Sequence, residues 1–265
     1  MSIHPTAIVD DGATVADGVT LGPYAVIGAG VTLASGVSVG HHASITGPTT
    51  IGRDTTVFPY AAIGGDAQEK KYAGEVGFLT IGERNVFREY TTVNRGTRSG
   101  HTTIGDDNLF MAYSHVAHDA TIGNHCAFVN SANIAGHVRI EDHAVLGGLV
   151  GVHQHCRVGR YAMVSGGAMV AQDVPPFTIA RGDRARLYGL NIVGLRRNGF
   201  SLDAVNALKG AYRELFHQGL PLRIAVEQVR ETYAAMPDVN ELLGFMEAST
   251  RGICRSAGTG ASADG

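Results

Sequence analysis

Apolar residues recur at every sixth position over most of the chain, and this period constrains the fold more than any other feature. One run steps by six from Val9 to Ile63, and the same phase returns at Ile81, Phe87 and Val93. After a shift of one residue in phase, a second run steps by six from Ile104 to Val170. A helix repeats about every 3.6 residues and a strand every two, so a sustained period of six indicates a solenoid of short strands.

Each hexapeptide is predicted to form a short strand and a corner, and three of them form one coil of 18 residues. Strand alternation points the apolar residue i and the small residue i−2 inward. A glycine often follows residue i, and we expect it there because the turn needs an unusual backbone dihedral angle. These glycines include Gly22, Gly40, Gly52, Gly105, Gly123, Gly147 and Gly159. Because side chains fill the interior, any chemistry must occur on the outside.

The composition is consistent with this fold and excludes several classes of protein. The 265 residues include 36 Gly and no Trp, and the net charge of −3 gives no general affinity for nucleic acid. Cys126 and Cys156 occupy inward i−2 positions, so we interpret them as core residues. Reduced cysteines favour a cytoplasmic protein. The longest apolar stretch, at 144–152, is too short to span a membrane, so we expect no membrane insertion.

Two segments interrupt the repeat and are predicted to be loops that leave the solenoid. They are residues 65–80, which are mostly polar, and residues 95–101. Loops on a rigid scaffold often carry function. The repeat begins within the first ten residues, so we expect no domain before it.

The repeat ends near Pro175 and a helical pattern follows a basic connecting segment. Ser201 is a candidate N-cap, a second helix is expected from about Leu222 to Ala235, and Pro237 opens a third. We therefore predict a solenoid domain at 1–185, a helical domain at 186–255 and a disordered tail at 256–265.

The 18-residue coil predicts which corner residues stack. Three columns should lie on one edge of the solenoid, namely Ala117/Ala135/His153, His118/Gly136/Gln154 and Asp119/His137/His155, with His115 on their flank. Histidine is the usual general base near neutral pH. The backbone N–H of Gly136, next to His118, could stabilise an oxyanion. No Ser or Cys lies in the columns, which favours direct attack by a substrate hydroxyl. The alternative is that these histidines only form hydrogen bonds along the stack.

Several longer motifs are more specific than the repeat. They are QEKKYAGE at 68–75, HVAHD at 115–119, AGH at 135–137, VHQ at 152–154, VAQDVPP at 170–176, NIVGLRRNGF at 191–200 and STRG at 249–252. Together they closely resemble the acyl-carrier-protein–UDP-N-acetylglucosamine O-acyltransferases, which catalyse the first step of lipid A synthesis in Gram-negative bacteria. The resemblance implies a left-handed parallel β-helix with a C-terminal helical domain, assembled as a homotrimer with active sites between subunits.

The resemblance also implies a reaction and roles for individual residues. An (R)-3-hydroxyacyl group would pass from acyl carrier protein to the 3-hydroxyl of UDP-N-acetylglucosamine, with no metal and no cofactor besides the carrier's phosphopantetheine. His118 would be the general base, Asp119 would orient it, and Gly136 would supply the oxyanion N–H. Gly166 would set the acyl-chain length. Substrate contacts would come from Gln68, Glu69, Lys71, His115, His137, His153, Gln154, Asn191 and Arg197.

Other functions remain open at this point. Four positions depart from the family pattern, namely Glu69, Asn94, Val193 and Asn198. The acceptor could therefore carry a 3-amino group, or the chain could be another hexapeptide-repeat acyltransferase. The related N-acyltransferase of the same pathway carries an N-terminal uridine-recognition domain, for which this solenoid starts too early. A zinc carbonic anhydrase on this solenoid uses two histidines five positions apart, and no such pair occurs here. An ice-binding solenoid would present a flat, repetitive Thr face instead of a varied polar edge.

Overall fold

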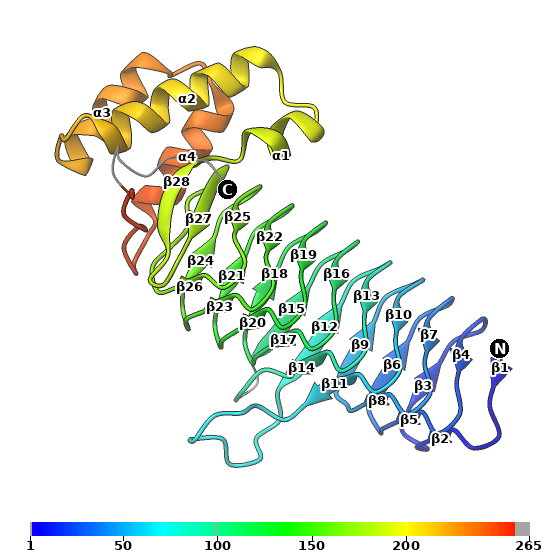
Figure 1. Cartoon of the computed structure of the whole chain (residues 1–265). Coiled ribbons are helices and arrows are strands. Elements are labelled where there is room, and N and C mark those ends of the chain that lie inside the picture. The colour runs from blue at the N-terminus through cyan, green and yellow to red at the C-terminus, as the bar shows by residue number, and fades with distance from the viewer. Residues whose placement is uncertain (1, 99, 258–265) are drawn as a thin grey trace.

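The chain folds into a three-sided solenoid of short parallel strands, capped at one end by helices (Figure 1). The structure is a computed structural model and describes residues 2–98 and 100–257. Within these residues, sheet A contains β1 (Ser2–Ile3), β4 (Thr20–Leu21), β7 (Ser38–Val39), β10 (Thr56–Val57), β13 (Val86–Phe87), β16 (Leu109–Phe110), β19 (Ala127–Phe128), β22 (Val145–Leu146), β25 (Met163–Val164), β27 (Thr178–Arg181) and β28 (Arg186–Leu190).

The other two sides are built in the same way. Sheet B contains β2 (Ile8–Val9), β5 (Val26–Ile27), β8 (Ser44–Ile45), β11 (Ala62–Gly65), β14 (Thr92–Asn94), β17 (His115–Val116), β20 (Asn133–Ile134), β23 (Gly151–Val152) and β26 (Met169–Val170). Sheet C contains β3 (Thr14–Val15), β6 (Val31–Leu33), β9 (Thr49–Ile51), β12 (Phe78–Ile81), β15 (His101–Ile104), β18 (Thr121–Ile122), β21 (Arg139–Ile140) and β24 (Arg157–Val158). The chain visits A, B and C in turn, so we name the corners the AB, BC and CA edges.

The strand register explains the two phases of the sequence. In a regular coil, partners are 18 positions apart, as in His115 and Asn133. Ala62 instead pairs with Thr92, 30 positions later, so the first loop adds 12 residues and preserves the period of six. Thr92 pairs with His115, 23 positions later, so the second loop adds five residues and shifts the phase by one. Both predicted loops are confirmed, and both leave the solenoid at the BC edge.

The predicted inward positions form the core. From Val19 to Val170, residues i and i−2 are buried, whereas Val9 in the first coil is exposed. The rings of Phe87, Phe110 and Phe128 stack with centroids 4.7 and 4.5 Å apart. Cys126 and Cys156 are buried free thiols, as core residues should be. Burial raises the pKa of Cys126 to about 12, so this thiol stays protonated at neutral pH.

Two asparagines occupy inward positions and form a buried polar ladder. Asn85 Nδ2 donates to the carbonyl of Gly105 at 2.8 Å, and Asn108 Nδ2 donates to Gly123 O at 2.9 Å. Asn85 Oδ1 accepts hydrogen bonds from the backbone and side-chain nitrogens of Asn108, each at 3.0 Å. The ladder thus satisfies polar groups that burial would otherwise leave unpaired.

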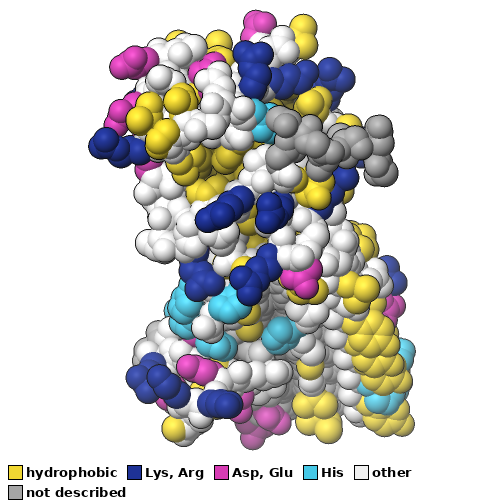
Figure 2. All heavy atoms as spheres, turned by 60° about the vertical axis from the view of Figure 1, so that its left-hand side comes forward, with side chains coloured by type: hydrophobic (Ala, Val, Ile, Leu, Met, Phe, Trp, Pro, Cys, Tyr) yellow, Lys and Arg dark blue, Asp and Glu magenta, His cyan; other side chains and the backbone are white. Residues whose placement is uncertain are grey.

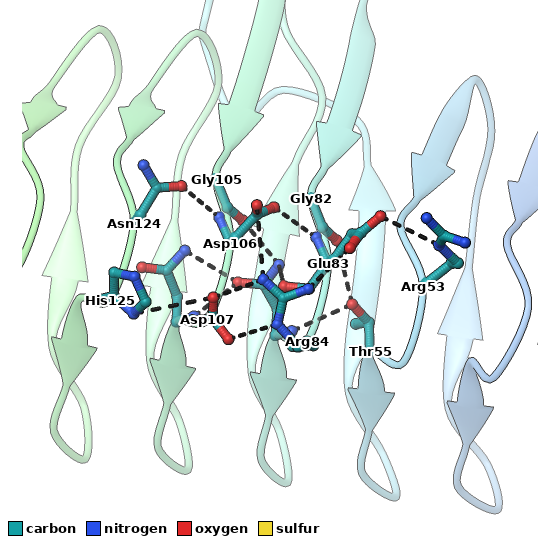
Figure 3. Close-up of polar contacts among 12 residues, drawn as sticks. Arg53, Thr55, Gly82, Glu83, Arg84, Gly105, Asp106, Asp107, Asn124 and His125 are labelled. Atoms are coloured by element: carbon teal, nitrogen blue, oxygen red, sulfur yellow. Dashed lines mark hydrogen bonds and ion pairs between the residues drawn. The ribbon is translucent and has the colours of Figure 1, made fainter.

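Charged side chains continue this bonding on the outside of the CA edge (Figure 3). The Arg84 guanidinium pairs with Asp107 on one neighbouring coil and with Glu83 beside it, each at 2.8 Å. Asp106 Oδ1 accepts the backbone N–H of Glu83 at 2.7 Å, and Asn124 Oδ1 accepts that of Asp106 at 2.8 Å. Each coil therefore bonds to the next through side chains as well as through the sheets.

The prediction for the glycines after residue i is wrong in its reason. The left-handed backbone occurs three residues after i, at non-glycine positions such as Asp107 (φ 58°) and His125 (φ 55°). The glycine directly after i is needed because the next coil approaches closely: a Cβ on Gly105 would lie 2.7 Å from the carbonyl oxygen of Gly123 and closer still to the side chain of Asn124. Gly64 is an exception, with φ 79°.

Four helices follow the solenoid in the described residues: α1 (Ile192–Arg197), α2 (Leu202–His217), α3 (Leu222–Thr232) and α4 (Pro237–Glu247). The Ser201 hydroxyl caps α2 by accepting the N–H of Ala204 at 3.1 Å, as predicted. The predicted second and third helices are present as α3 and α4, whereas the short α1 was not predicted. In the described chain, no helix has the length and apolar character needed to span a bilayer.

The helices are fixed to the last coils at the CA edge. Arg160 pairs with Glu241 at 2.6 Å and Asp238 at 3.2 Å, both on α4. The Arg157 guanidinium lies 4.1 Å from the ring centroid of Phe245. The helical unit therefore caps the end of the solenoid.

The segments directly before and after the helices pair with strands of the solenoid. The predicted boundary at 185/186 falls in the turn between β27 and β28, which pair antiparallel in sheet A, so the helices begin only at Ile192. Of the predicted tail, Ser256 bridges Leu187, and the N–H of Ala257 donates to the carbonyl of Leu187 at 2.9 Å. The rest of that prediction, 258–265, lies outside the described residues.

Two glycine-to-alanine variants separate close approach from backbone conformation. Gly18 has φ 79°, but a Cβ there would make only an ordinary contact, 3.6 Å from the backbone nitrogen of Gly36, so Gly18→Ala should cost only about 1 kcal/mol of left-handed strain. Gly105→Ala should cost about 3 kcal/mol, because the methyl group meets the backbone of the next coil. Urea unfolding of both variants measures this difference. If Gly18→Ala is the more destabilising, close approach does not explain these glycines.

Candidate active site

A groove of about 770 Å³ runs along sheet B and the BC edge. Two of the three predicted columns, Ala117/Ala135/His153 and His118/Gly136/Gln154, supply much of its wall, whereas the Asp119/His137/His155 column does not line it. The first loop contributes Gln68, Glu69 and Lys71. Figure 2 shows histidine side chains gathered in a hollow of this face, with Lys and Arg side chains above them. The lining residues from the solenoid are His115, Ala117, His118, Asn133, Ile134, Ala135, Gly136, Gly151, Val152, His153, Gln154, Met169, Val170 and Ala171, joined by Asp183 and Arg184.

His118 and Asp119 form a hydrogen-bonded pair at the turn after β17. His118 Nδ1 lies 2.9 Å from Asp119 Oδ2, and His118 is only 8% exposed. Burial favours the neutral form of Asp119, but hydrogen bonds from His118 and from the hydroxyl and backbone N–H of Thr97 outweigh it and lower its pKa. Asp119 is therefore a carboxylate at neutral pH. Because a carboxylate only accepts, Nδ1 of His118 must carry the hydrogen, which leaves Nε2 free to accept a proton.

Gly136 lies against His118 on the next coil, as the columns predict. A Cβ at Gly136 would lie 2.7 Å from both Nε2 and Cε1 of His118, so no side chain fits there. Among the described residues, the backbone N–H of Gly136 donates to no other protein group in the hydrogen bonds found. The corner thus combines a free imidazole nitrogen and a free N–H donor beside the groove.

In the column Asp119/His137/His155, the two histidine rings stack on each other. His137 and His155 have centroids 4.7 Å apart, and the ring of His137 meets that of His118 edge-on at 5.2 Å. His137 Nε2 lies 3.9 Å from Asp119 Oδ2. His118, Asp119 and His137 are close enough to be tested as metal ligands, with ligand atoms within 4.8 Å of one another. Two of these groups are already hydrogen-bonded to each other, which is also the arrangement of an acid–base pair.

His115 lies on β17, three residues before His118. Its Nδ1 lies 2.7 Å from the hydroxyl of Thr92 on the preceding coil. Burial lowers the pKa of His115, and the neighbouring His118 lowers it further. The neutral imidazole is therefore favoured at this position.

The base of the first loop is held by the residues that open the second. Arg95 contacts Asp66 and the carbonyl of Gly47, and Asn94 Nδ2 donates to the carbonyl of Asp66 at 2.7 Å. The Tyr72 hydroxyl donates to the Asp66 carboxylate at 3.1 Å. These bonds fix the point at which the loop that carries Gln68, Glu69 and Lys71 leaves the solenoid.

Three predicted site residues lie away from the groove of a single chain. Asn191 is buried as the N-cap of α1, where it accepts the N–H of Gly194 at 3.1 Å and donates to the carbonyl of Tyr161 at 3.0 Å. Arg197 is exposed in the last turn of α1. Gly166 lies at the AB edge between β25 and β26.

Some residues of the site were not predicted. Asn133 and Met169 could have been found, because the 18-residue register places them in line with His115. Thr97, which holds Asp119, gives no such signal because it belongs to the inserted loop. Asp183 and Arg184 reach the groove from the segment after β27, outside the repeat.

Comparison with known proteins gives consistent matches over 96% of the chain. Residues 173–254 match the family model described as UDP-N-acetylglucosamine O-acyltransferase, domain 2, and residues 101–136 match the bacterial transferase hexapeptide model. The acyl-[acyl-carrier-protein]–UDP-N-acetylglucosamine O-acyltransferase of Stenotrophomonas maltophilia is 48% identical over 96% of this chain and 97% of its own length. That of Trichlorobacter lovleyi is 55% identical over 96% of this chain and 100% of its own.

Solved structures agree with these matches. The UDP-N-acetylglucosamine acyltransferase of Francisella novicida superposes with a TM-score of 0.93 at 35% identity and covers 96% of this chain and 94% of its own. The structure from Acinetobacter baumannii has the same TM-score of 0.93 at 39% identity, with 96% and 99% of the two chains covered.

The lowered pKa of His115 predicts a stability change with pH. Because the folded state holds this imidazole with a pKa below the unfolded value of about 6.5, the unfolded chain binds the proton more tightly. His115 therefore destabilises the fold as the pH falls below about 6.5. His115→Gln should flatten the fall in unfolding free energy between about pH 7 and 5, measured by urea titration at several pH values. An unchanged slope would remove His115 as its source.

Proposed function

Because the chain belongs to the family of acyl-[acyl-carrier-protein]–UDP-N-acetylglucosamine O-acyltransferases, we propose that it moves an (R)-3-hydroxyacyl group from acyl carrier protein to the 3-hydroxyl of UDP-N-acetylglucosamine, the first step of lipid A synthesis. The observation that carries the proposal is the His118–Asp119 pair facing Gly136 in the groove. This arrangement supplies a proton acceptor and an N–H donor at one place, as acyl transfer requires.

His118 acts as the general base in this mechanism. The acceptor hydroxyl oxygen attacks the thioester carbon, a C–O bond forms, and the hydroxyl proton passes to Nε2 of His118. Asp119 holds Nδ1–H and stabilises the imidazolium that results. The intermediate then collapses, the C–S bond breaks, and His118 returns the proton to the departing thiolate of phosphopantetheine.

Gly136 serves the same step in two ways. Its backbone N–H is available to donate to the oxyanion of the tetrahedral intermediate. Its missing side chain leaves His118 free to face the reacting atoms, because any Cβ would press on the imidazole. Both roles depend on the stacking of one coil on the next.

The remaining groove residues are assigned to substrate binding. Gln68, Glu69 and Lys71 reach over from the loop, and His115, His153 and Gln154 line the solenoid side. His137 stands beside Asp119 at the rim. Polar groups of both signs on two walls suit a nucleotide sugar, which presents hydroxyl, amide and phosphate groups together.

A homotrimer would complete the site. Gly166, Asn191 and Arg197 lie outside the groove of their own chain, so in this proposal they serve the groove of an adjacent subunit. Asn191 would then contact the substrate from its place at the N-cap of α1. Arg197 would face phosphates or the carrier protein, and Gly166 would border the acyl chain. The carrier brings its own phosphopantetheine, and the proposal includes no further cofactor. Three free buried cysteines support a cytoplasmic location.

Replacement of His118 tests the base directly. His118→Ala should lower kcat by at least about 10²-fold while leaving assembly unchanged, because one general base typically contributes that much. Product formation from UDP-N-acetylglucosamine and a panel of (R)-3-hydroxyacyl carrier proteins provides the measurement. His125→Ala, at the exposed stacked position of the CA edge, is the matched control and should retain full activity.

The outcomes of this assay separate the alternatives. Near-normal turnover by His118→Ala would remove it from the mechanism. Product formed only with a 3-amino UDP-sugar would show that this sugar is the acceptor. Glu69, Val193 and Asn198, which depart from the family pattern, would then account for the difference. Stoichiometric zinc in active protein, with loss of activity on chelation, would reassign His118, Asp119 and His137 to a metal site.

Gly166 provides the test of chain-length selection. A Cβ on Gly166 would lie 3.3 Å from the carbonyl oxygen of Gly148, so a side chain can be introduced with a small local adjustment. Gly166→Met should shift the preferred acyl donor to a shorter chain, because its side chain would fill space that the acyl group uses. Competition between carrier proteins of different acyl length measures this, and an unchanged preference would end the assignment.

A further inference from the structure

After α4 the chain returns to the solenoid, and this C-terminal strap, residues 249–257, is built into the last coil. The buried Asp173 holds it: the Asp173 N–H donates to Gly252 O at 2.8 Å, and Asp173 O accepts from the N–H of Cys254 at 2.9 Å. The Ser249 hydroxyl donates to Asp173 Oδ2 at 2.7 Å. The strap is therefore fixed at a point close to the groove.

From this strap, Arg251 reaches two groups of the groove wall. Its Nη2 lies 3.2 Å from Nδ1 of His153 and donates to the carbonyl oxygen of Ala171 at 3.1 Å. His153 and Ala171 line the groove, whereas Arg251 is not one of its lining residues. Its charge also reaches the same cluster: burial, His137 and then Arg251 lower the pKa of His155. Arg251 thus contacts two lining residues without lining the groove itself.

The contact with Arg251 selects one form of His153. Nδ1 of His153 also lies 3.2 Å from the carbonyl oxygen of Gln154, to which it could only donate. The guanidinium is always charged and has no acceptor, so beside it Nδ1 is favourable only as an acceptor. A charge-assisted hydrogen bond is roughly twice as strong as a neutral one. The Arg251 contact should therefore prevail, and the hydrogen should reside on Nε2.

We propose that Arg251 is a positioning residue that holds His153 as the Nε2–H tautomer, so that His153 presents a hydrogen-bond donor to an oxygen atom of the molecule in the groove. The role in catalysis rests on the proposed function, but the tautomer does not. Through Arg251, the strap at residues 249–257 contacts the wall of the candidate active site. The neighbouring Arg255 lies on the same strap with an exposed side chain, and it offers a matched control.

Nitrogen-15 NMR of histidine-labelled protein measures the tautomer directly. His153→Asn identifies the signals of His153. In the wild type they should report Nδ1 without hydrogen and Nε2 with it. Arg251→Met, which keeps an unbranched stem and removes every donor, should shift His153 toward the Nδ1–H form bonded to Gln154. Arg255→Met should leave the signals unchanged. An Nδ1–H form in the wild type would overturn the proposal, and that result needs no variant.

A second variant separates positioning from loss of the strap. Ser249→Ala removes the hydrogen bond to Asp173 but leaves Arg251 in place, so it should lower stability and keep the tautomer. If Ser249→Ala shifted the tautomer as much as Arg251→Met, the effect would belong to the strap as a whole and the proposal would fail.

Kinetics then relate the tautomer to the reaction. In Arg251→Met, kcat/KM should fall about tenfold, mainly through KM, since one hydrogen bond to the bound molecule is weakened. Arg251→Lys should recover part of the loss, because an ammonium group can still donate to Nδ1. A tautomer shift without any change in KM would overturn the role of His153 as donor. A wild type inactive toward every donor would refute the proposed function and leave the tautomer result standing.

Discussion

The structure depends on one constraint, the parallel register between successive coils. Backbone bonds such as Ala117 N–H to Ile134 O at 2.9 Å and Ala135 N–H to Val152 O at 3.1 Å hold neighbouring coils about 4.8 Å apart. At that spacing, any side chain meets the equivalent side chain of the next coil. The phenylalanine stack, the asparagine ladder and the contact of His118 with Gly136 all follow from it. The candidate active site is therefore a consequence of the repeat that forms the core.

The left-handed corner positions give each edge its own character. A non-glycine residue there carries about 1–2 kcal/mol of strain, and Asp, Asn and His tolerate it best. On the AB edge the position holds exposed aromatic rings, including Tyr60 and Tyr90, which stack with centroids 5.3 Å apart. On the BC edge it holds Asp119, His137 and His155. Stacking between coils can offset the strain. The type of residue then decides whether the corner only packs against its neighbours or carries groups that can take part in a reaction.

The sequence predicted the columns because a period of six and a coil of 18 follow from apolar residues alone. It also predicted both loops, since each interrupts the run of apolar residues. The reason for the glycines was wrong, because a sequence shows where a glycine stands but not how near the next coil lies, as at Gly105. Thr97 and Arg251 were not assigned to the site for a different reason. Their positions depend on inserted or returning segments, which no repeat relates to His118.

The BC edge differs from the other two because both loops leave the solenoid there and the C-terminal strap reaches the groove beside it. The repeat supplies rigidity: His118 and Gly136 are set by adjacent coils and cannot move independently. The first loop adds Gln68, about 50 residues before His118 in sequence, to the groove. The strap adds Arg251, more than 100 residues after it. A solenoid has no interior cavity to hold a substrate, so segments outside the repeat must form the other walls. The rigid columns thus place the reacting groups, while the added segments enclose and orient what they act on.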